Sequence, residues 1–416
     1  MASETYDVMV VGGGIIGSAC ALALRRDGSS VLLVDRGEPE RAASWGNAGH
    51  FAYEQIFPLA TPALWAQLPQ LFFSRQSPLR IPPRNFRSLA PWLARFAWNT
   101  RGSQFRRATG ALAQLLAAAP EAWRRLAELA GLQALIKSSP VLVVALDAAA
   151  LAAKRSVMGA LRQQGIDNEE LGPEAARAVE PMLRSDVAGA FVYPRAHFCV
   201  DPAALAAGVR DAYRAAGGAV VDDRIGAIQT TADGVVGAGS ARSWTARQCV
   251  LAAGIGSREL LRGLSVRVPL AAERGYHLMI PYLEGAPRVR VPIIGAQPQF
   301  VITPMAKGLR LAGTVELALD DAHPDWRRAT MMKEFAERII GPLDAAGATK
   351  WMGCRPSLPD SLPVIGRIPA APSIVGAFGH QHLGLTLSAI TAELVAAIVR
   401  NRPPPLDIAP YAISRF

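Results

Sequence analysis

The sequence predicts an α/β protein of two interleaved domains, one Rossmann-like and the other an α+β domain built on an antiparallel sheet. Its 416 residues exceed one ordinary domain and suit two, each with its own core. An apolar strand near residue 6 runs through a glycine-rich turn into a helix, and two later strands also enter glycine turns. Because no low-complexity linker separates the chain into halves, we expect the two domains to interleave.

The composition is that of a globular protein with an unevenly distributed positive charge. Half of the residues are hydrophobic and 19% are charged, which excludes a disordered or collagen-like chain. The formal net charge is +10, yet no acidic residue lies between Glu54 and Glu121. Eight arginines occupy that stretch: Arg75, Arg80, Arg84, Arg87, Arg95, Arg101, Arg106 and Arg107. Four cysteines without a CxxC pair indicate neither a disulfide framework nor a zinc site, so we expect a cytoplasmic protein without a metal.

The first 35 residues carry the clearest motif. A strand over 6–11, a helix over 18–26 and a strand over 31–34 surround the glycines Gly12, Gly14 and Gly17, and Asp35 ends the second strand. The first glycine allows the tight turn, the second lets the backbone approach a pyrophosphate, and the third lets the helix pack on the strand. The helix N-terminus offers free N–H groups to the phosphates, and Asp35 can accept hydrogen bonds from a ribose diol. This order of elements predicts a dinucleotide site.

The remaining elements follow from apolar patterning. Apolar strands over 248–253 and 373–377 enter glycine turns, and the second leads into a helix over 386–400. Strand-like alternation covers 218–222, 234–238, 276–281, 300–304 and 309–314, and alanine-rich helices cover 110–135, 146–163 and 202–216. We therefore assign 1–55, 190–263 and 340–416 to the nucleotide domain, and 56–189 and 264–339 to the substrate domain.

Several motifs in chain order carry a resemblance to a known family. They are SWGNAG at 44–49, VDP at 200–202, AAG at 252–254, RGY at 274–276, GCRP at 353–356, GH at 379–380 and GLT at 384–386. Together with the opening glycine motif, they make the chain resemble the FAD-dependent oxidoreductases of the D-amino-acid oxidase and glycine oxidase type. Within that type the sequence is most similar to the catalytic subunits of bacterial D-amino-acid dehydrogenases.

The resemblance implies FAD bound without a covalent bond, because lining up Pro359 and Asp360 with the family pattern places Gly353, and not Cys354, where some relatives attach the flavin. A helix beginning at Leu385 and Thr386 would stabilise negative charge at the flavin N1–C2 edge. The implied cofactor-binding residues are Gly12, Gly14, Ile16, Gly17, Asp35, Arg36, Ser44, Asn47, Ala48, Gly49, Ala253, Gly254, Gly379, His380, Gly384, Leu385 and Thr386.

Four residues are candidates for the chemistry: Arg355, Tyr276, His50 and His382. In the resembling enzymes an arginine in GxRP binds the substrate carboxylate, a role that suits a planar guanidinium. Tyr276 either adds a hydroxyl contact or bonds within the protein. A histidine either accepts a proton or only packs, because hydride transfer from a neutral amine needs no base. Relatives have GHG-x-x-G where this chain has Gln381 and His382, so the substrate stays open.

The resemblance implies oxidation of the C–N bond of a D-amino acid by hydride transfer to flavin N5, a cyclic imino acid such as D-hydroxyproline being one candidate. Electrons would pass to a quinone or another acceptor. The alternatives are an oxygen-dependent oxidase of the glycine or sarcosine type and an FAD-binding subunit of a larger dehydrogenase. The chain is compatible with an oligomer.

The arginine-rich segment 71–110 bears on location. Phe86, Leu89, Leu93 and Phe96 have helical spacing among the arginines. Such a helix either packs on the substrate domain with a solvated basic face or attaches the enzyme to an anionic membrane surface or an acidic partner. We expect a cytoplasmic protein, with peripheral attachment to the inner membrane as the second option. Nucleic acid is not expected, because one basic stretch without a binding module is weak support.

Overall fold

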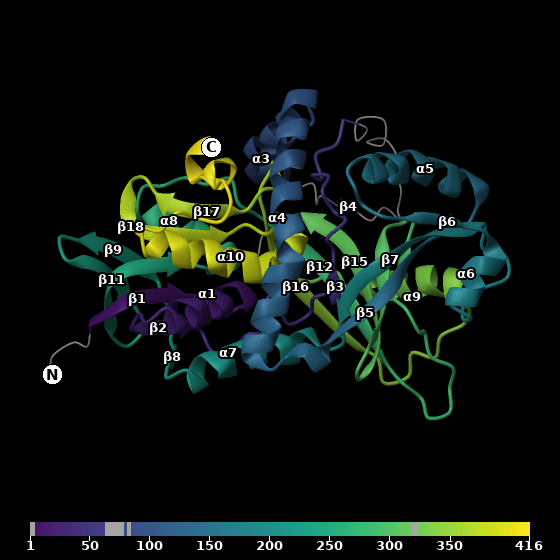
Figure 1. The fold of residues 1–416 in the computed structure, drawn as a ribbon, viewed down its shortest axis with the longest axis horizontal. Helices are drawn as coiled ribbons and strands as arrows, with labels where there is room; N and C mark the ends of the chain where they lie inside the picture. The colour runs from purple at the N-terminus through teal and green to yellow at the C-terminus, as the bar shows by residue number, and fades with distance from the viewer. Residues whose placement is uncertain (1–4, 63–78, 81–84, 318–322) are drawn as a thin grey trace.

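The computed structural model describes residues 5–62, 79–80, 85–317 and 323–416 and contains two sheets with helices packed on both (Figure 1). The first sheet, at the left of Figure 1, includes the N-terminal strand, and the second lies at the right. Segments from the beginning, the middle and the end of the chain meet in each sheet. The predicted fold class, α/β with an interleaved α+β domain, is confirmed.

The eight-stranded sheet has the order β17-β18-β11-β1-β2-β8, with the β9–β10 hairpin beside β11. Its strands are β1 (Thr5–Val11), β2 (Val31–Asp35), β8 (Ala219–Asp222), β9 (Ala227–Thr231), β10 (Gly234–Ala238), β11 (Ser243–Leu251), β17 (Val364–Ile368) and β18 (Ala371–Phe378). β1 pairs in parallel with β2 and β11, and β11 pairs in parallel with β18. Both faces are covered, so the central strands are continuously apolar.

The ten-stranded sheet has the order β16-β12-β15-β14-β13-β5-β7-β3, with β4 beside β15 and β6 beside β7. Its strands are β3 (His50–Phe51), β4 (Leu79–Arg80), β5 (Ile136–Ala145), β6 (Glu169–Leu171), β7 (Gly189–Cys199), β12 (Ala271–Pro281), β13 (Ile293–Gly295), β14 (Phe300–Met305), β15 (Gly308–Leu317) and β16 (Thr349–Ser357). All its pairings are antiparallel except β13–β5 and β15–β4.

Sheet membership differs from the predicted segments at three places. β3, β7 and β16 all pair within the ten-stranded sheet, although the prediction placed most of their residues in the nucleotide domain. Apolar alternation shows that a stretch is a strand but does not identify the partner strand. The chain therefore passes between the two sheets after β2, after β7, after β11 and after β16.

The helices of the described residues are α1 (Ile15–Arg26), α3 (Phe86–Asn99), α4 (Gly102–Ala130), α5 (Ala148–Gln163), α6 (Pro173–Val179), α7 (Pro202–Ala215), α8 (Ser257–Gly263), α9 (Arg327–Ile340) and α10 (Gly384–Val399). Short 3-10 turns are η1 (Pro39–Arg41), η3 (Gln133–Leu135), η4 (Gly254–Gly256), η5 (Gln381–Leu383), η6 (Ala409–Tyr411) and η7 (Ile413–Arg415). α4 ends earlier than predicted because Gly131 adopts the left-handed conformation at φ 68°.

One apolar core joins the two parts of the molecule. Val8 and Val10 of β1 pack with α1 and α10, and the same cluster continues through α4 to Val141 and Val143 of β5. The segment Gln381–Val399 is apolar and long enough to cross a membrane, but most of it is buried within this core. The two interleaved sheets therefore pack against one shared apolar core and do not depend only on separate cores.

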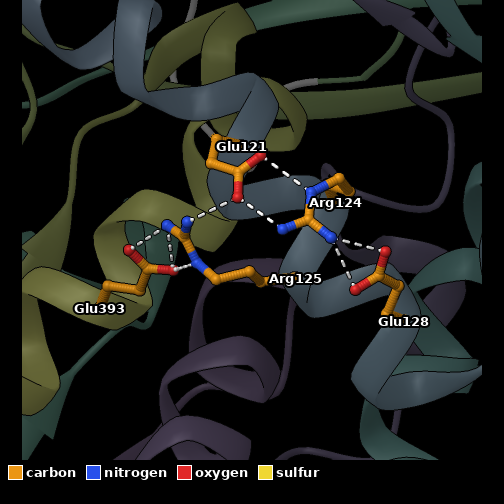
Figure 2. A network of polar contacts seen from close by, with 5 residues as sticks. All are labelled: Glu121, Arg124, Arg125, Glu128 and Glu393. Atoms are coloured by element: carbon orange, nitrogen blue, oxygen red, sulfur yellow. Dashed lines mark hydrogen bonds and ion pairs between the residues drawn. The ribbon is translucent and has the colours of Figure 1, made fainter.

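α4 is also joined to α10 by surface ion pairs (Figure 2). Arg125 on α4 forms a two-bond pair with Glu393 on α10, at 2.9 Å for each bond. Glu121 links Arg125 to Arg124, which in turn binds Glu128. Each of the four residues on α4 is about half-exposed, so single pairs stabilise little, and the network chiefly sets how α4 lies on α10.

Candidate functional site

The predicted cofactor-binding residues come together at one edge of the eight-stranded sheet. β1, β2, β11 and β18 run in parallel, so the glycine turn after β1, Asp35, Ala253 and Gly379 all follow the carboxyl ends of strands. Ligands of open parallel sheets bind at this edge. Arg36 differs from these residues because its side chain is half-exposed. Its guanidinium lies 3.4 Å from the carboxylate of Glu38.

The glycine turn after β1 is closely packed in the way a dinucleotide cradle requires. Gly12 has φ 104°, and an added Cβ there would lie 2.5 Å from the carbonyl oxygen of Ala252. A Cβ on Gly17 would lie 1.8 Å from the carbonyl oxygen of Gly12. The Gly13 N–H donates to Asp35 Oδ2 at 2.5 Å, which holds the acid against the turn. No acidic residue lies in the first turn of α1, so its positive end fits a pyrophosphate.

The loop 44–49 is held by helix α1 and by the ten-stranded sheet. Ser44 Oγ accepts from the N–H of Ile15 at 3.0 Å, and this bond attaches the loop to the start of α1. From the second sheet, Arg310 donates to the carbonyl of Asn47 at 2.6 Å, and Thr303 Oγ1 donates to that of Ala48 at 2.8 Å. Burial is the main cause that lowers the pKa of Arg310 to about 10. The sequence offered no signal for Arg310 or Thr303, since both lie in strands whose pattern indicates only packing.

The predicted flavin contacts at the start of α10 are also fixed by distant segments. Thr386 Oγ1 accepts from the N–H of Ala52 at 3.1 Å, which ties the end of β3 to this helix. Trp123 Nε1 donates to the carbonyls of Leu385 and Thr386 at 2.9 and 3.1 Å. The first turn of α10 has no acidic residue, so its N–H groups fit the role predicted at a flavin edge.

His380 lies beneath this turn as a buried neutral imidazole. Its Nε2 is 3.0 Å from Thr391 Oγ1, and burial lowers its pKa to about 3. His277, stacked on Trp351 and bonded to the carbonyl of Gly46, has a pKa lowered to about 3, also chiefly by burial. Both side chains therefore pack as uncharged groups at neutral pH.

This burial predicts acid sensitivity. A histidine with a depressed folded pKa takes up its proton more readily when unfolded, so stability is complete above about pH 6.5 and falls as the pH is lowered toward 3. Each such histidine contributes at most about 1.4 kcal/mol per pH unit. The wild-type protein should lose unfolding free energy when the pH falls from 6 to 5. We expect this loss to be smaller by about 1 kcal/mol in His380→Asn. Urea denaturation followed by tryptophan fluorescence measures it, and equal pH slopes in both proteins would contradict it.

Three of the four predicted chemical residues belong to one group of interacting charges. The charges of Glu273, Arg355, Glu54 and His50 all act on the pKa of His382, although burial is the main cause that lowers it. We call these five residues the coupled group. They come from β3 and the turn after it, β12, β16 and η5. Glu54 and Glu273 were missed by the sequence prediction, because neither belongs to a recognisable motif.

Within the coupled group, Arg355 is held by Glu273. The Nη1 of Arg355 donates to Glu273 Oε1 at 3.0 Å and approaches the carbonyl of Thr314 at 3.4 Å. Ser357 Oγ donates to the other oxygen of Glu273 at 3.2 Å. The guanidinium also fills the space beside Gly275, where an added Cβ would lie 2.3 Å from Nη2. The glycine in RGY therefore makes room for the arginine in GCRP.

Tyr276 lies outside the coupled group. Its buried hydroxyl donates to Glu316 Oε2 at 2.6 Å and accepts from the N–H of Asp325 at 3.0 Å. Burial, with a further contribution from the bond to Glu316, raises its pKa to about 12. These bonds correspond to the alternative in which the tyrosine bonds within the protein. Among the described residues, no group of three or more His, Cys, Asp or Glu side chains could hold a metal ion.

The family described as DAO, FAD dependent oxidoreductase, matches residues 7–398. A D-amino-acid oxidase of Bradyrhizobium diazoefficiens is 33% identical over 99% of both chains. A D-amino acid dehydrogenase 2 of Ralstonia nicotianae is 32% identical over 98% of this chain and 100% of its own. The crystal structure of glycine oxidase from Geobacillus kaustophilus covers 100% of both chains with a TM-score of 0.76 and 22% identity.

Proposed function

Since the chain belongs to the DAO family of FAD dependent oxidoreductases, we propose that it oxidises the C–N bond of a D-amino acid and passes the electrons to a quinone or another acceptor other than oxygen. The similarity to a D-amino-acid oxidase and to D-amino acid dehydrogenases, over nearly the whole chain, supports the substrate class. One of these relatives is named an oxidase and the others are named dehydrogenases, so their names do not agree on the electron acceptor. The acceptor is therefore the more specific part of the proposal.

Arg355 is the observation that carries the proposal. Both hydrogen bonds found for its guanidinium among the described residues use Nη1, so Nε and Nη2 can turn to a substrate carboxylate. Two parallel bonds from a guanidinium fix the orientation of a carboxylate as well as its charge. Glu273 holds the guanidinium from the other side, which restricts its motion before the substrate binds.

FAD, when bound, supplies the two-electron acceptor for this oxidation. The residues that would hold it are the glycine turn with Asp35, the loop 44–49, Ala253 with Gly254, and the first turn of α10. The chain itself would contribute binding, orientation of the substrate Cα–H and exclusion of water. A cyclic imino acid such as D-hydroxyproline is one substrate that fits this scheme.

Anaerobic bleaching of the flavin tests the proposal. Mixing the purified protein with a panel of D-amino acids and their L-enantiomers should bleach the flavin absorbance with the D-forms. No bleaching by any amine would instead favour an FAD-binding subunit whose partner performs the chemistry. Rapid peroxide formation in air with glycine or sarcosine would favour the oxygen-dependent alternative. A dye acceptor in the same panel identifies the accepted side chains.

Attachment to an anionic membrane surface is the second part of the proposal. Arg87 on α3 and Arg106 and Arg107 on α4 are exposed, and no acidic residue lies near them in sequence. Arg75 and Arg84 lie outside the described residues. The predicted helix forms as α3, and Leu89 and Trp92 bury its inner face, so packing on the protein and a basic outer face coexist.

Each arginine near an anionic surface contributes about 1 kcal/mol. Replacing Arg87, Arg106 and Arg107 by glutamine should therefore weaken binding to phosphatidylserine-containing liposomes by about a hundredfold. Arg214, Arg247 and Arg262 are exposed on other elements, so their triple glutamine variant is a control with equal charge loss. Cosedimentation with liposomes measures both, and equal losses would exclude a specific role for the α3–α4 surface.

A further inference from the structure

His50 and Glu54 form a buried pair that the function proposed above does not use. Nε2 of His50 lies 2.8 Å from Glu54 Oε1, and each residue is only 8% exposed. His50 sits in β3 opposite Phe198, and a tight turn after the strand carries Glu54 back beside it. The bond from Ala52 to Thr386 fixes this turn against the start of α10. The pair is thus held rigidly at the predicted flavin side of the molecule.

The bond to Glu54 determines where His50 carries its proton. With Glu54 as a carboxylate, which only accepts hydrogen bonds, the hydrogen between the two side chains lies on Nε2 of His50. In the neutral ring the lone pair then lies on Nδ1. This Nδ1 is buried and has no hydrogen-bond partner among the described residues. A buried acceptor without a partner destabilises the folded chain, so the position is suited to a ligand that brings a donor.

Among the charged groups around His50, Glu54 is the carboxylate that lies nearest to it. His382 on η5 has its pKa lowered mainly by burial, and the charges of Glu273 on β12 and Arg355 on β16 also act on it. Arg355 is itself paired with Glu273, so that carboxylate is already balanced. Glu54 is the remaining carboxylate of the coupled group, and it lies directly against His50.

The neighbouring tyrosines remain neutral. Burial, followed by the charge of Glu54, raises the pKa of both Tyr53 and Tyr193. His197, on β7, stacks edge-on against Tyr53 and has its pKa lowered by burial, but its charge is not among those that act on His382. Glu54 is therefore the carboxylate placed to balance a positive charge on the imidazole of His50.

Resting on the proposed function, we propose that Nδ1 of His50 takes the proton from the substrate ammonium and that Glu54 is the residue that positions the imidazole for this step. One N–H bond of the ammonium breaks, the Nδ1–H bond forms, and the electron pair stays on the substrate nitrogen. The positive charge moves to the imidazolium, where the Glu54 carboxylate balances it. The neutral amine that results has the electron pair needed to form the C=N bond of the product.

The pH dependence of anaerobic flavin bleaching tests the proton step. In His50→Asn only substrate that is already neutral can react, so the second-order bleaching rate should rise about tenfold per pH unit up to the amine pKa. The wild-type rate should be much less steep below that pKa. Glu54→Gln preserves the size of the side chain but not its charge, so its profile should lie between the two. His197→Asn is the matched control from the adjoining strand and should keep the wild-type profile.

A second measurement does not depend on turnover. The chain has six histidines, so 15N labelling of their imidazoles gives a tractable spectrum. We expect the His50 signal to show the hydrogen on Nε2 in the wild-type protein, with a mixture of tautomers in Glu54→Gln. Hydrogen on Nδ1 in the wild-type protein would overturn the proposal even if a variant failed to fold. A wild-type pH profile in His50→Asn would overturn it as well.

The two proposals fail separately. If no D-amino acid bleaches the wild-type flavin but another amine does, the proposed substrate class is wrong, and the same variants are compared with that amine. If D-amino acids bleach it and the variants leave the pH profile unchanged, the substrate class stands and His50 is not the proton acceptor. If no amine bleaches it, both proposals fail as catalytic statements.

Discussion

Replacing Gly17 by alanine should give a protein that purifies without flavin. The added Cβ would lie 1.8 Å from the carbonyl oxygen of Gly12 and 3.3 Å from Ala252 Cβ, so α1 has to move away from the turn that cradles the pyrophosphate. The obstacle is backbone and not a flexible side chain, so no small adjustment relieves it. We expect FAD affinity to fall by about a hundredfold or more, equivalent to about 3 kcal/mol. The ratio of flavin to protein absorbance after gel filtration measures the loss.

The control for this variant is Gly110→Ala. Gly110 lies within α4, and an added Cβ there meets nothing within 4 Å. The alanine should keep the flavin and raise stability by up to about 1 kcal/mol, because alanine favours a helix. The wild-type protein should release free FAD on acid precipitation, since we expect no covalent bond. A yellow Gly17→Ala protein with normal flavin content would remove the glycine turn from the cofactor site.

Arg355→Leu should raise KM for amino-acid substrates by about a hundredfold, which is about 3 kcal/mol, while FAD stays bound. Part of this effect has a second cause, because the variant leaves the buried Glu273 carboxylate without its partner. Glu273→Gln and the double variant Arg355→Leu/Glu273→Gln separate the two causes. If Arg355 binds the substrate, KM stays high in the double variant although thermal stability recovers. Steady-state kinetics and thermal unfolding of the four proteins provide both quantities.

Gly275→Ala offers an independent check. The new methyl group would occupy the place of the Arg355 Nη2, so the guanidinium must turn without losing its charge. We expect KM to rise in this variant with normal FAD content. Unchanged KM in Arg355→Leu, or recovery of normal KM in the double variant, would show that Arg355 has only a structural role.

The parts of the fold that could be predicted from the sequence are those whose reasons are local. The glycine spacing, the strands around it and Asp35 follow from neighbours in the chain, and the structure places β1, α1 and β2 within a few residues of the prediction. The antiparallel second sheet was also predicted, although its register was not. Pairing depends on contacts between distant segments, for which a single sequence carries little signal.

The predicted bounds of β12 leave out a residue of the coupled group. β12 begins at Ala271, whereas the prediction began at Tyr276, because Glu273 and Arg274 interrupt the apolar pattern. Both charges are buried, Glu273 against Arg355 and Arg274 at 3.8 Å from Glu316. Patterning assumes that charged residues face water. A strand that buries charged residues for a site is therefore not recognised from its apolar pattern. The same pattern gives no signal for residues such as Glu54 and Glu273.

The loop 44–49 makes cofactor retention a property of the whole chain. Its carbonyls are held by Arg310 and Thr303, and its Ser44 holds the start of α1. The dinucleotide edge can therefore be complete only after the ten-stranded sheet has formed. The unfolding of both sheets becomes one cooperative event, and FAD, by binding the intact form, stabilises both sheets. Flavin fluorescence during denaturation would thus also report the integrity of the ten-stranded sheet.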